Sequence, residues 1–216
     1  MKSKYYSLSE ARQMQNDSSA MQSPRWYRPQ VDPQDIRVLM QKSDIIAFRD
    51  TFIWFMGLGI SGYMAVLLWP NILSIPFWFI YGVLYGSASD SRWHECGHRT
   101  AFKTEWMNKV VYHIASFMLV RNPVVWKASH VRHHTDTIIV GRDPEIVAMR
   151  PPDLLRIVLN SFGLIDTLVS VNRMLLHIRG QIHPDEQTFL RIEEYAHVFR
   201  VARIWLAIYL ATGFAA

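Results

Sequence analysis

Two groups of histidines in this chain have the spacing of metal ligands. His94 and His98 are four residues apart in RWHECGHR, and the segment SHVRHHT contains the second group. At 3.6 residues per turn, each group falls on one face of a helix. Clustered neutral imidazoles are poorly solvated and clustered charged ones repel, so their convergence is favourable only around a metal. The predicted ligands of this shared centre are His94, His98, His130, His133 and His134.

The type of metal follows from the number of ligands. Glu95 follows His94, so residues 94–98 match H-E-x-x-H, the pattern of zinc peptidases. A zinc enzyme uses three protein ligands and one open position, and five histidines exceed that need. Surplus imidazole ligands suit iron or copper, and a two-metal centre more than a single ion. The zinc peptidase therefore stays an alternative. Glu95 either orients an imidazole from outside the ligand shell or is an exposed charge.

The distribution of charge indicates a membrane protein. The chain has 216 residues, 23 Lys and Arg, 18 Asp and Glu, and a formal net charge of +5. No Lys or Arg lies between Thr51 and Ser91, and none follows Arg203. A bilayer crossing leaves such a gap, with the basic residues on the cytoplasmic side. A nucleic-acid-binding module would instead interleave basic and aromatic residues in one folded unit, so no nucleic-acid partner is expected.

Two uncharged runs predict a transmembrane hairpin. Residues 51–69 match the roughly 20 residues that span a hydrocarbon core, and residues 72–89 follow after a turn at Pro70–Asn71. Both ends of the hairpin, the N-terminus and the metal centre are expected on the cytosolic face. The run from Ile204 to Ala216 is read as a third span cut off part-way. The predicted fold is all-α: a multi-pass membrane protein whose cytosolic or interfacial helices carry the histidines.

The remaining elements are predicted from caps and breakers. Residues 1–24 read as a mobile tail. The predicted helices are an amphipathic surface helix over 35–49, a continuation of the second span through Asp90 into 91–99, a helix from Thr104 to Val120, a helix begun by Asn122–Pro123, a long helix from Pro151–Pro152 to Gly180, and a last helix from Pro184. A turn is expected at Asp143–Pro144. We predict a cytosolic N-terminal segment, 1–44, and a membrane domain, 45–216.

With both histidine groups placed, the chain resembles the membrane-bound fatty acid desaturases. HECGH (94–98) is similar to their first histidine box, HxxxH, and HVRHH (130–134) to their second, HxxHH. WKASHVRHHTDT and the acidic segment GRDPEI (141–146) also resemble this family. The order of hairpin, first box, about thirty residues, second box and interfacial helices agrees with it. The resemblance covers roughly residues 45–216.

The resemblance implies an activity and its cofactors. The five histidines would bind a non-haem di-iron centre that activates O₂ and removes hydrogens from an acyl chain, which introduces a C=C bond. The substrate would be an acyl-lipid or acyl-CoA, and electrons would come from an external ferredoxin or cytochrome b5. A related di-iron hydroxylase, the zinc peptidase and a non-catalytic membrane partner are the alternatives.

The chain departs from the family pattern after His134. Family members carry a third box, HxxHH or QxxHH, and no later segment fits it. The expectation is a fragment, or a site that a second polypeptide completes. His197 is a candidate extra ligand, whereas His113 and His177 are read as interfacial residues and His183 has no assigned role.

Several neighbouring residues have two interpretations each. Asp143 and Glu145 either hydrogen-bond to the box histidines or cap and begin a helix. Trp126 either lines a substrate groove or belongs to an interfacial aromatic belt, and Trp93 is read as an interface anchor. Cys96, the single cysteine, excludes an intrachain disulfide and is read as a small residue packed inside a helix.

Overall fold

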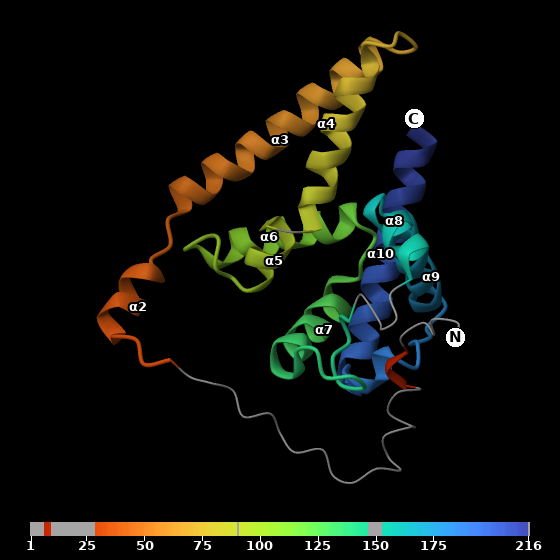
Figure 1. The fold of residues 1–216 in the computed structure, drawn as a ribbon. Coiled ribbons are helices and arrows are strands. Elements are labelled where there is room, and N and C mark those ends of the chain that lie inside the picture. Colours follow the sequence, from red (N-terminus) through yellow and green to blue (C-terminus); the bar gives the residue numbers. More distant parts are fainter. Residues whose placement is uncertain (1–6, 10–28, 90, 147–152, 216) are drawn as a thin grey trace. The chain divides into compact units, whose positions relative to one another are not determined.

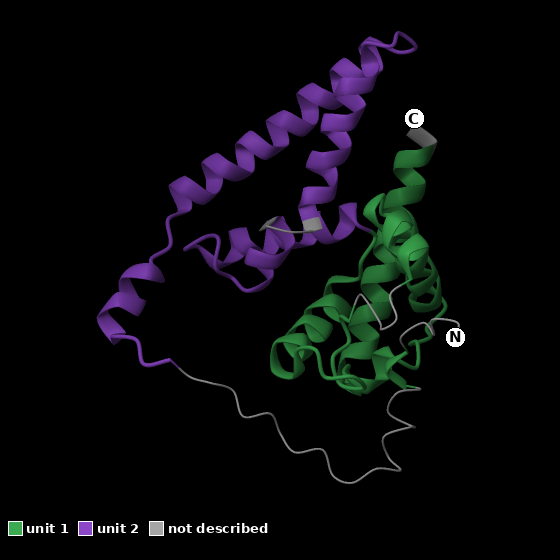
Figure 2. Cartoon of the chain, viewed as in Figure 1, with its two compact units in different colours: residues 1–27, 120–216 green, residues 28–119 purple. Residues whose placement is uncertain are grey.

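The computed structural model describes residues 7–9, 29–89, 91–146 and 153–215, and the regular elements in these ranges are helices. This agrees with the all-α prediction. The chain divides into two compact units, described separately below: residues 28–119, and residues 1–27 together with 120–216 (Figure 2). Most of the tail predicted over 1–24 lies outside the described residues. Its described part, residues 7–9, is packed rather than free, since Leu8 is buried.

The unit of residues 28–119 begins with two helices where one was predicted. Helix α2 (Pro33–Leu39) starts after Asp32, whose side chain accepts from the Gln34 amide at 2.7 Å. Helix α3 (Asp44–Leu67) starts after Ser43, which is in an extended conformation. The predicted helix over 35–49 is therefore wrong, because the cap at Ser43 starts a new helix before the apolar run.

Helices α3 and α4 (Ser74–Gly86) lie side by side as a hairpin (Figure 1). The Trp54 indole donates to the Leu84 carbonyl at 2.8 Å. In addition, Gly62 lets the Tyr81 ring approach to 3.1 Å from the place a Cβ would occupy. The hairpin itself was predicted, and its outer apolar side chains are exposed.

One of the predicted membrane spans corresponds to a helix of sufficient length. Among the described residues, α3 is the one unbent helix long and apolar enough to cross a bilayer. At 1.5 Å per residue the 13 residues of α4 reach about 20 Å, short of a core of about 30 Å. A second crossing by residues 72–89, a third begun at Ile204 and a multi-pass topology remain predictions.

The second half of this unit carries the first histidine motif. Helix α4 does not continue to residue 99 as predicted, because a 3₁₀ turn (Ser87–Ser89) interrupts it and a separate helix, α5 (Ser91–Gly97), follows. Helix α6 (Glu105–Met118) packs beside α5 (Figure 1). Thr104 precedes α6 as predicted, and its amide and hydroxyl both donate to Asp44, at 2.8 and 2.7 Å. This contact joins the start of α3 to the start of α6.

In the other unit, α7 begins as predicted and the next helix does not. Helix α7 (Pro123–Asp136) starts after Asn122, whose side chain accepts from the Val124 amide at 3.2 Å. The predicted long helix to Gly180 is two helices, α8 (Leu154–Ser161) and α9 (Leu164–Ile178), bent by 79°. The break lies at Gly163, which has a left-handed φ of 69°. Pro151 and Pro152 lie outside the described residues.

The final helix starts later than predicted. After α9 come two 3₁₀ turns, η2 (Glu186–Thr188) and η3 (Ile192–Glu194), and then α10 (Tyr195–Ala215). The buried cluster of Val125, Ile182, Leu190 and Val198 lies between these turns, α7 and α10. The Asn122 amide also donates to the Val198 carbonyl at 3.0 Å. Burial of these apolar residues holds the segment after Pro184 as packed turns rather than a helix.

Candidate metal centre

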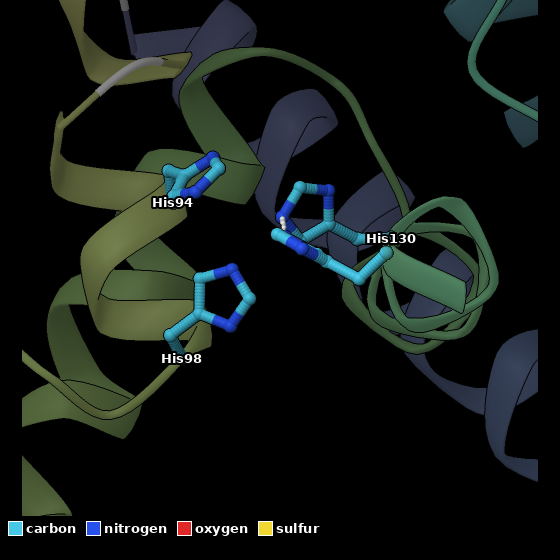
Figure 3. Close-up of side chains that lie close together, drawn as sticks. His94, His98 and His130 are labelled. Carbon is cyan, nitrogen blue, oxygen red and sulfur yellow. Dashed lines mark hydrogen bonds between the residues drawn. The ribbon is translucent and has the colours of Figure 1, made fainter. Parts of the chain in front are cut away.

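The first histidine motif lies at the end of α5, with His94 in the helix and His98 directly after its last residue. His94 and His98 project from one side of this helix (Figure 3), and their ring centroids are 4.8 Å apart. The opposite side packs into the unit: Trp93 and Cys96 are each 4% exposed, and the Trp93 ring lies 5.9 Å from that of Tyr112 on α6. His94 and His98 therefore lie on the same side of the helix, as predicted.

Close packing against α6 fixes the orientation of α5. A Cβ on Gly97 would come within 3.2 Å of the Tyr112 ring, so a side chain at this position would push the two helices apart. The loop after His98 is held by Asn108, which is 1% exposed. Its side chain accepts from the Phe102 amide at 3.0 Å and donates to the Phe102 carbonyl at 2.8 Å.

The other α5 residues singled out in the sequence differ in their burial. Trp93 is a core residue, not an interface anchor, because α6 covers it. Cys96 is buried as predicted, and burial raises the pKa of its thiol to about 12, so it is not a reactive thiol. Glu95 is exposed, as the simpler interpretation of an exposed charge requires.

The second motif, on α7, brings two imidazole nitrogens close together. The Nε2 atoms of His130 and His134 are 3.1 Å apart, the contact drawn from His130 in Figure 3. Two nitrogens bound to one metal at about 2.1 Å and roughly a right angle would be about 3.0 Å apart. This pair therefore has the separation of two adjacent ligands.

A carboxylate behind His130 fixes which nitrogen faces outward. Glu145 Oε2 lies 3.0 Å from His130 Nδ1, and Glu145 Oε1 accepts from the Ser129 hydroxyl at 2.8 Å. Because a carboxylate accepts, Nδ1 carries the proton and Nε2 keeps its lone pair. Burial raises the pKa of Glu145, but hydrogen bonds from His130 and Ser129 outweigh it and hold the pKa below its usual range.

Asp143 holds His133 in the same way. Its two carboxylate oxygens lie 2.9 and 3.1 Å from His133 Nδ1, which leaves the Nε2 of His133 as the outward-facing atom. Asp143 is 1% exposed and also accepts from the backbone amides of Ile138 and Glu145, at 2.7 and 2.8 Å. Ile138 has a φ of 66°, a strained value for a β-branched residue that Asp143 helps to maintain.

These contacts choose between two predictions for the acidic segment. Asp143 and Glu145 bind the box histidines, so the interpretation as hydrogen-bonding carboxylates is confirmed. The alternative, in which they start a helix, is wrong because residues 141–146 form turns.

One buried charge beside the second motif was missed in the sequence. Asp136 is 1% exposed and lies between Arg132 Nε at 2.6 Å and Arg142 Nη2 at 2.7 Å. The two ion pairs tie the end of α7 to the GRDPEI segment, and so place the carboxylates that hold the histidines. The i, i+4 spacing of Arg132 and Asp136 was the available signal, but nothing local pointed to Arg142.

The other histidines differ in their surroundings. His177 is 1% exposed and its Nε2 lies 2.8 Å from Glu186, so its interpretation as an interfacial residue is wrong. His197 is exposed on α10, and nothing described here tests it as an extra ligand. Trp126 is half-buried beneath the guanidinium of Arg121, which lies 4.2 Å from its ring centroid. It lines a hollow within its own unit.

Comparison with known proteins identifies the family. A family model described as fatty acid desaturase matches residues 69–216, which include both histidine motifs. The chain belongs to the fatty acid desaturase family. The resemblance seen in the two boxes is thereby confirmed.

Individual relatives are similar over shorter stretches. The omega-6 fatty acid desaturase, endoplasmic reticulum isozyme 1, of Glycine max is 37% identical over 87 residues, 39% of this chain and 22% of the relative. The Delta(12)-oleate desaturase of Trichosanthes kirilowii is 26% identical over 164 residues, 69% of this chain and 44% of the relative. The sn-1 oleoyl-lipid 12-desaturase of a Picosynechococcus species is 32% identical over 82 residues, 38% of this chain and 23% of the relative. The matches thus span less than half of each relative's length, and no solved structure matches the chain.

Proposed function

We propose that this protein is an O₂-dependent fatty acid desaturase, in which a di-iron centre introduces a C=C bond into an acyl chain. The proposed ligands are His94, His98, His130, His133 and His134. The observation that carries the proposal is the pair of Nε2 atoms of His130 and His134, 3.1 Å apart, with Glu145 bonded to the far nitrogen of His130. Family membership supports the same activity.

The residues described here fit such a centre. Imidazole nitrogens suit iron, and a carboxylate on the second ring nitrogen is the usual partner of a metal-binding histidine. Two of the proposed ligands, His130 and His133, have this partner. When bound, the irons would supply the oxidation of an unactivated C–H bond. Glu145 and Asp143 hold the imidazoles of His130 and His133 each in one tautomer and orientation, so that these two rings need little rearrangement when metal binds.

Substrate and electron source are proposed from chemistry and from the relatives. The relatives named above are oleate, oleoyl-lipid or omega-6 desaturases, so oleoyl chains on lipids or CoA are the first substrates to test. An external donor, a ferredoxin or cytochrome b5, would supply electrons. We place the metal centre on the cytosolic face, in agreement with the basic residues on both sides of the predicted hairpin, up to Arg49 and from Arg92 onward.

Lipid analysis in a host that lacks 12-desaturation tests the activity. The full reading frame should convert oleoyl to doubly unsaturated chains, measured as fatty acid methyl esters. His130→Ala should abolish the product, whereas His113→Ala, a histidine outside both motifs, should retain it. Unchanged lipids with well-expressed protein would contradict the proposal, and a hydroxylated product would identify the related hydroxylase.

Metal analysis of the purified protein tests the cofactor separately. Two irons per chain are expected, with a loss of iron in His130→Ala and in His94→Ala. A single zinc that depends on His94 and His98, but not on His130, would instead favour the peptidase.

A further inference from the structure

The segment Ser7–Ser9 is bound to a residue about 176 positions away in the sequence. Asp185 Oδ1 accepts three hydrogen bonds from it: from the Ser7 hydroxyl at 3.0 Å, the Ser9 amide at 3.0 Å and the Ser9 hydroxyl at 2.8 Å. Leu8, between the two serines, is 4% exposed. All these residues belong to the unit of residues 1–27 and 120–216. One carboxylate therefore holds a short segment by its backbone and both hydroxyls.

Leu8 forms part of the wall of a hollow of about 310 Å³ in the same unit. Other lining residues come from α7, with Trp126 and Ser129, and from α9, with Arg173 and His177. Glu145, the partner of His130, also lines it. The segment that Asp185 holds thus forms part of the wall of a hollow that Glu145, behind the second histidine motif, also lines.

Two polar side chains that line the hollow, Arg173 and His177, each have one buried atom without a hydrogen-bond partner among the described residues. Within the described ranges, His177 Nδ1 and Arg173 Nη1 are buried and lack a hydrogen-bond partner. Both belong to side chains whose other atoms are engaged, by Glu186 at 2.8 Å and by Asp185 at 3.3 Å. Buried polar atoms without partners are costly, and both side chains line the same hollow as Leu8.

The hydrogen bonds between Asp185 and residues 7–9 should be sensitive to an added charge. Arg173 lies on its other oxygen at 3.3 Å, and His183 Nδ1 is 3.6 Å away. A second negative charge at Ser9, about 3 Å from the carboxylate, would meet strong repulsion at this distance in a partly buried site. The contact can therefore be broken by a change at either partner.

We propose that residues 7–9 are an intramolecular latch: Asp185 holds the segment, and Leu8 closes the hollow over Arg173, His177 and Glu145. Loss of the Asp185 charge, or gain of a negative charge at Ser9, opens it. The latch rests on the contacts of residues 7–9 alone and does not depend on the proposed desaturase activity.

Amide hydrogen exchange on the full chain in detergent tests the docking. The Ser9 amide should exchange slowly in the unmodified chain, and roughly ten-fold faster in Asp185→Asn, since a neutral acceptor replaces a charged one. Asp153→Asn is the matched control: it makes the same change at the cap of α8, where Asn also caps well. Equal Ser9 exchange in Asp185→Asn and the unmodified chain would overturn the latch.

A double-mutant cycle separates repulsion from a general loss of structure. Ser9→Asp should speed exchange of the segment at least ten-fold, and Ser9→Ala clearly less, because the Ser7 and backbone bonds remain. In Ser9→Asp with Asp185→Asn, exchange should slow again relative to Ser9→Asp alone. No difference between Ser9→Asp and Ser9→Ala would show that charge does not control the segment. Unchanged exchange in α10 identifies variants that have kept their fold.

Thiol labelling tests whether the latch closes the hollow. Ser170 lines it, and the one native cysteine, Cys96, is buried and in the other unit. A Ser170→Cys variant should react with a maleimide at least several-fold faster when Ser9→Asp is added. Equal labelling rates, with exchange at Ser9 already accelerated, would overturn the closing role of Leu8.

Discussion

His94 on α5 and His130 on α7 belong to pairs with the same i, i+4 spacing, yet their surroundings differ. On α5, aromatic packing and a glycine position the helix, and the adjacent carboxylate, Glu95, is exposed. On α7, buried or half-buried carboxylates hold individual imidazoles by their Nδ1 atoms. Helix packing orients the first motif. In the second motif, two of the three imidazoles also have a carboxylate on Nδ1.

The difference has a consequence for metal binding. A carboxylate on Nδ1 sets the tautomer of His130 and of His133, and leaves a lone pair on the Nε2 of each ring before any metal binds. We therefore expect α7 to contribute the more ordered part of the proposed centre, and substitutions around α7 to have the larger effects.

The largest effect is expected at Asp136. Asp136→Asn leaves Arg132 and Arg142, whose side chains are 31% and 22% exposed, without their counter-charge. Because water can partly solvate both guanidinium groups, we expect a cost of about 1–3 kcal/mol, less than for a fully buried pair. The apparent free energy of unfolding should fall by this order, measured by thermal or denaturant unfolding in detergent. A loss below about 1 kcal/mol would show that the second motif does not depend on this network.

A matched pair of glutamates tests the comparison directly. Glu145→Gln should weaken iron binding by about 10- to 100-fold, as the loss of a carboxylate partner of a ligand usually does. Glu95→Gln, the same change beside His94, should leave iron binding unchanged. Competition with a chelator measures both. Equal losses in the two variants would mean that the motifs are held alike.

The packing of α5 should respond to a single methyl group. Gly97→Ala places a Cβ 3.2 Å from the Tyr112 ring, and we expect a loss of roughly 1 kcal/mol, in the lower range for overpacking. Gly82→Ala is the control, because nothing lies within 4 Å of its Cβ position, and alanine favours the helix. A stabilising Gly97→Ala would indicate that α5 is not held by close contact with α6.

The smallest effect is expected at the surface of the unit of residues 28–119. Arg99 and Glu105 form an ion pair at 2.8 Å with both side chains more than half exposed. Glu105→Gln should therefore change the free energy of unfolding by less than about 1 kcal/mol. A loss as large as that of Asp136→Asn would contradict the contrast between an exposed pair and a buried one.

Much of the local structure could be predicted from neighbouring residues. Asn122–Pro123 marks the start of α7, because capping involves residues only a few positions apart. Thr104 marks the start of α6, but its hydroxyl bonds to the distant Asp44 and makes no capping bond. The break at Gly163 was missed, since one glycine in an apolar pattern does not reveal its φ. Asn160 and Asp166 are joined across that bend by two hydrogen bonds of 3.1 Å. Only the folded structure shows this contact.

The sequence by itself determined the spacing of the five histidines, the uncharged run of α3 and the family, because each is a property of residues close together in the chain. Only the tertiary structure decided that Glu145 and Asp143 hold His130 and His133, that Asp136 joins two arginines, and that Asp185 binds residues 7–9. Those pairings depend on which buried polar groups find partners when distant segments pack, and no one-dimensional pattern encodes that choice.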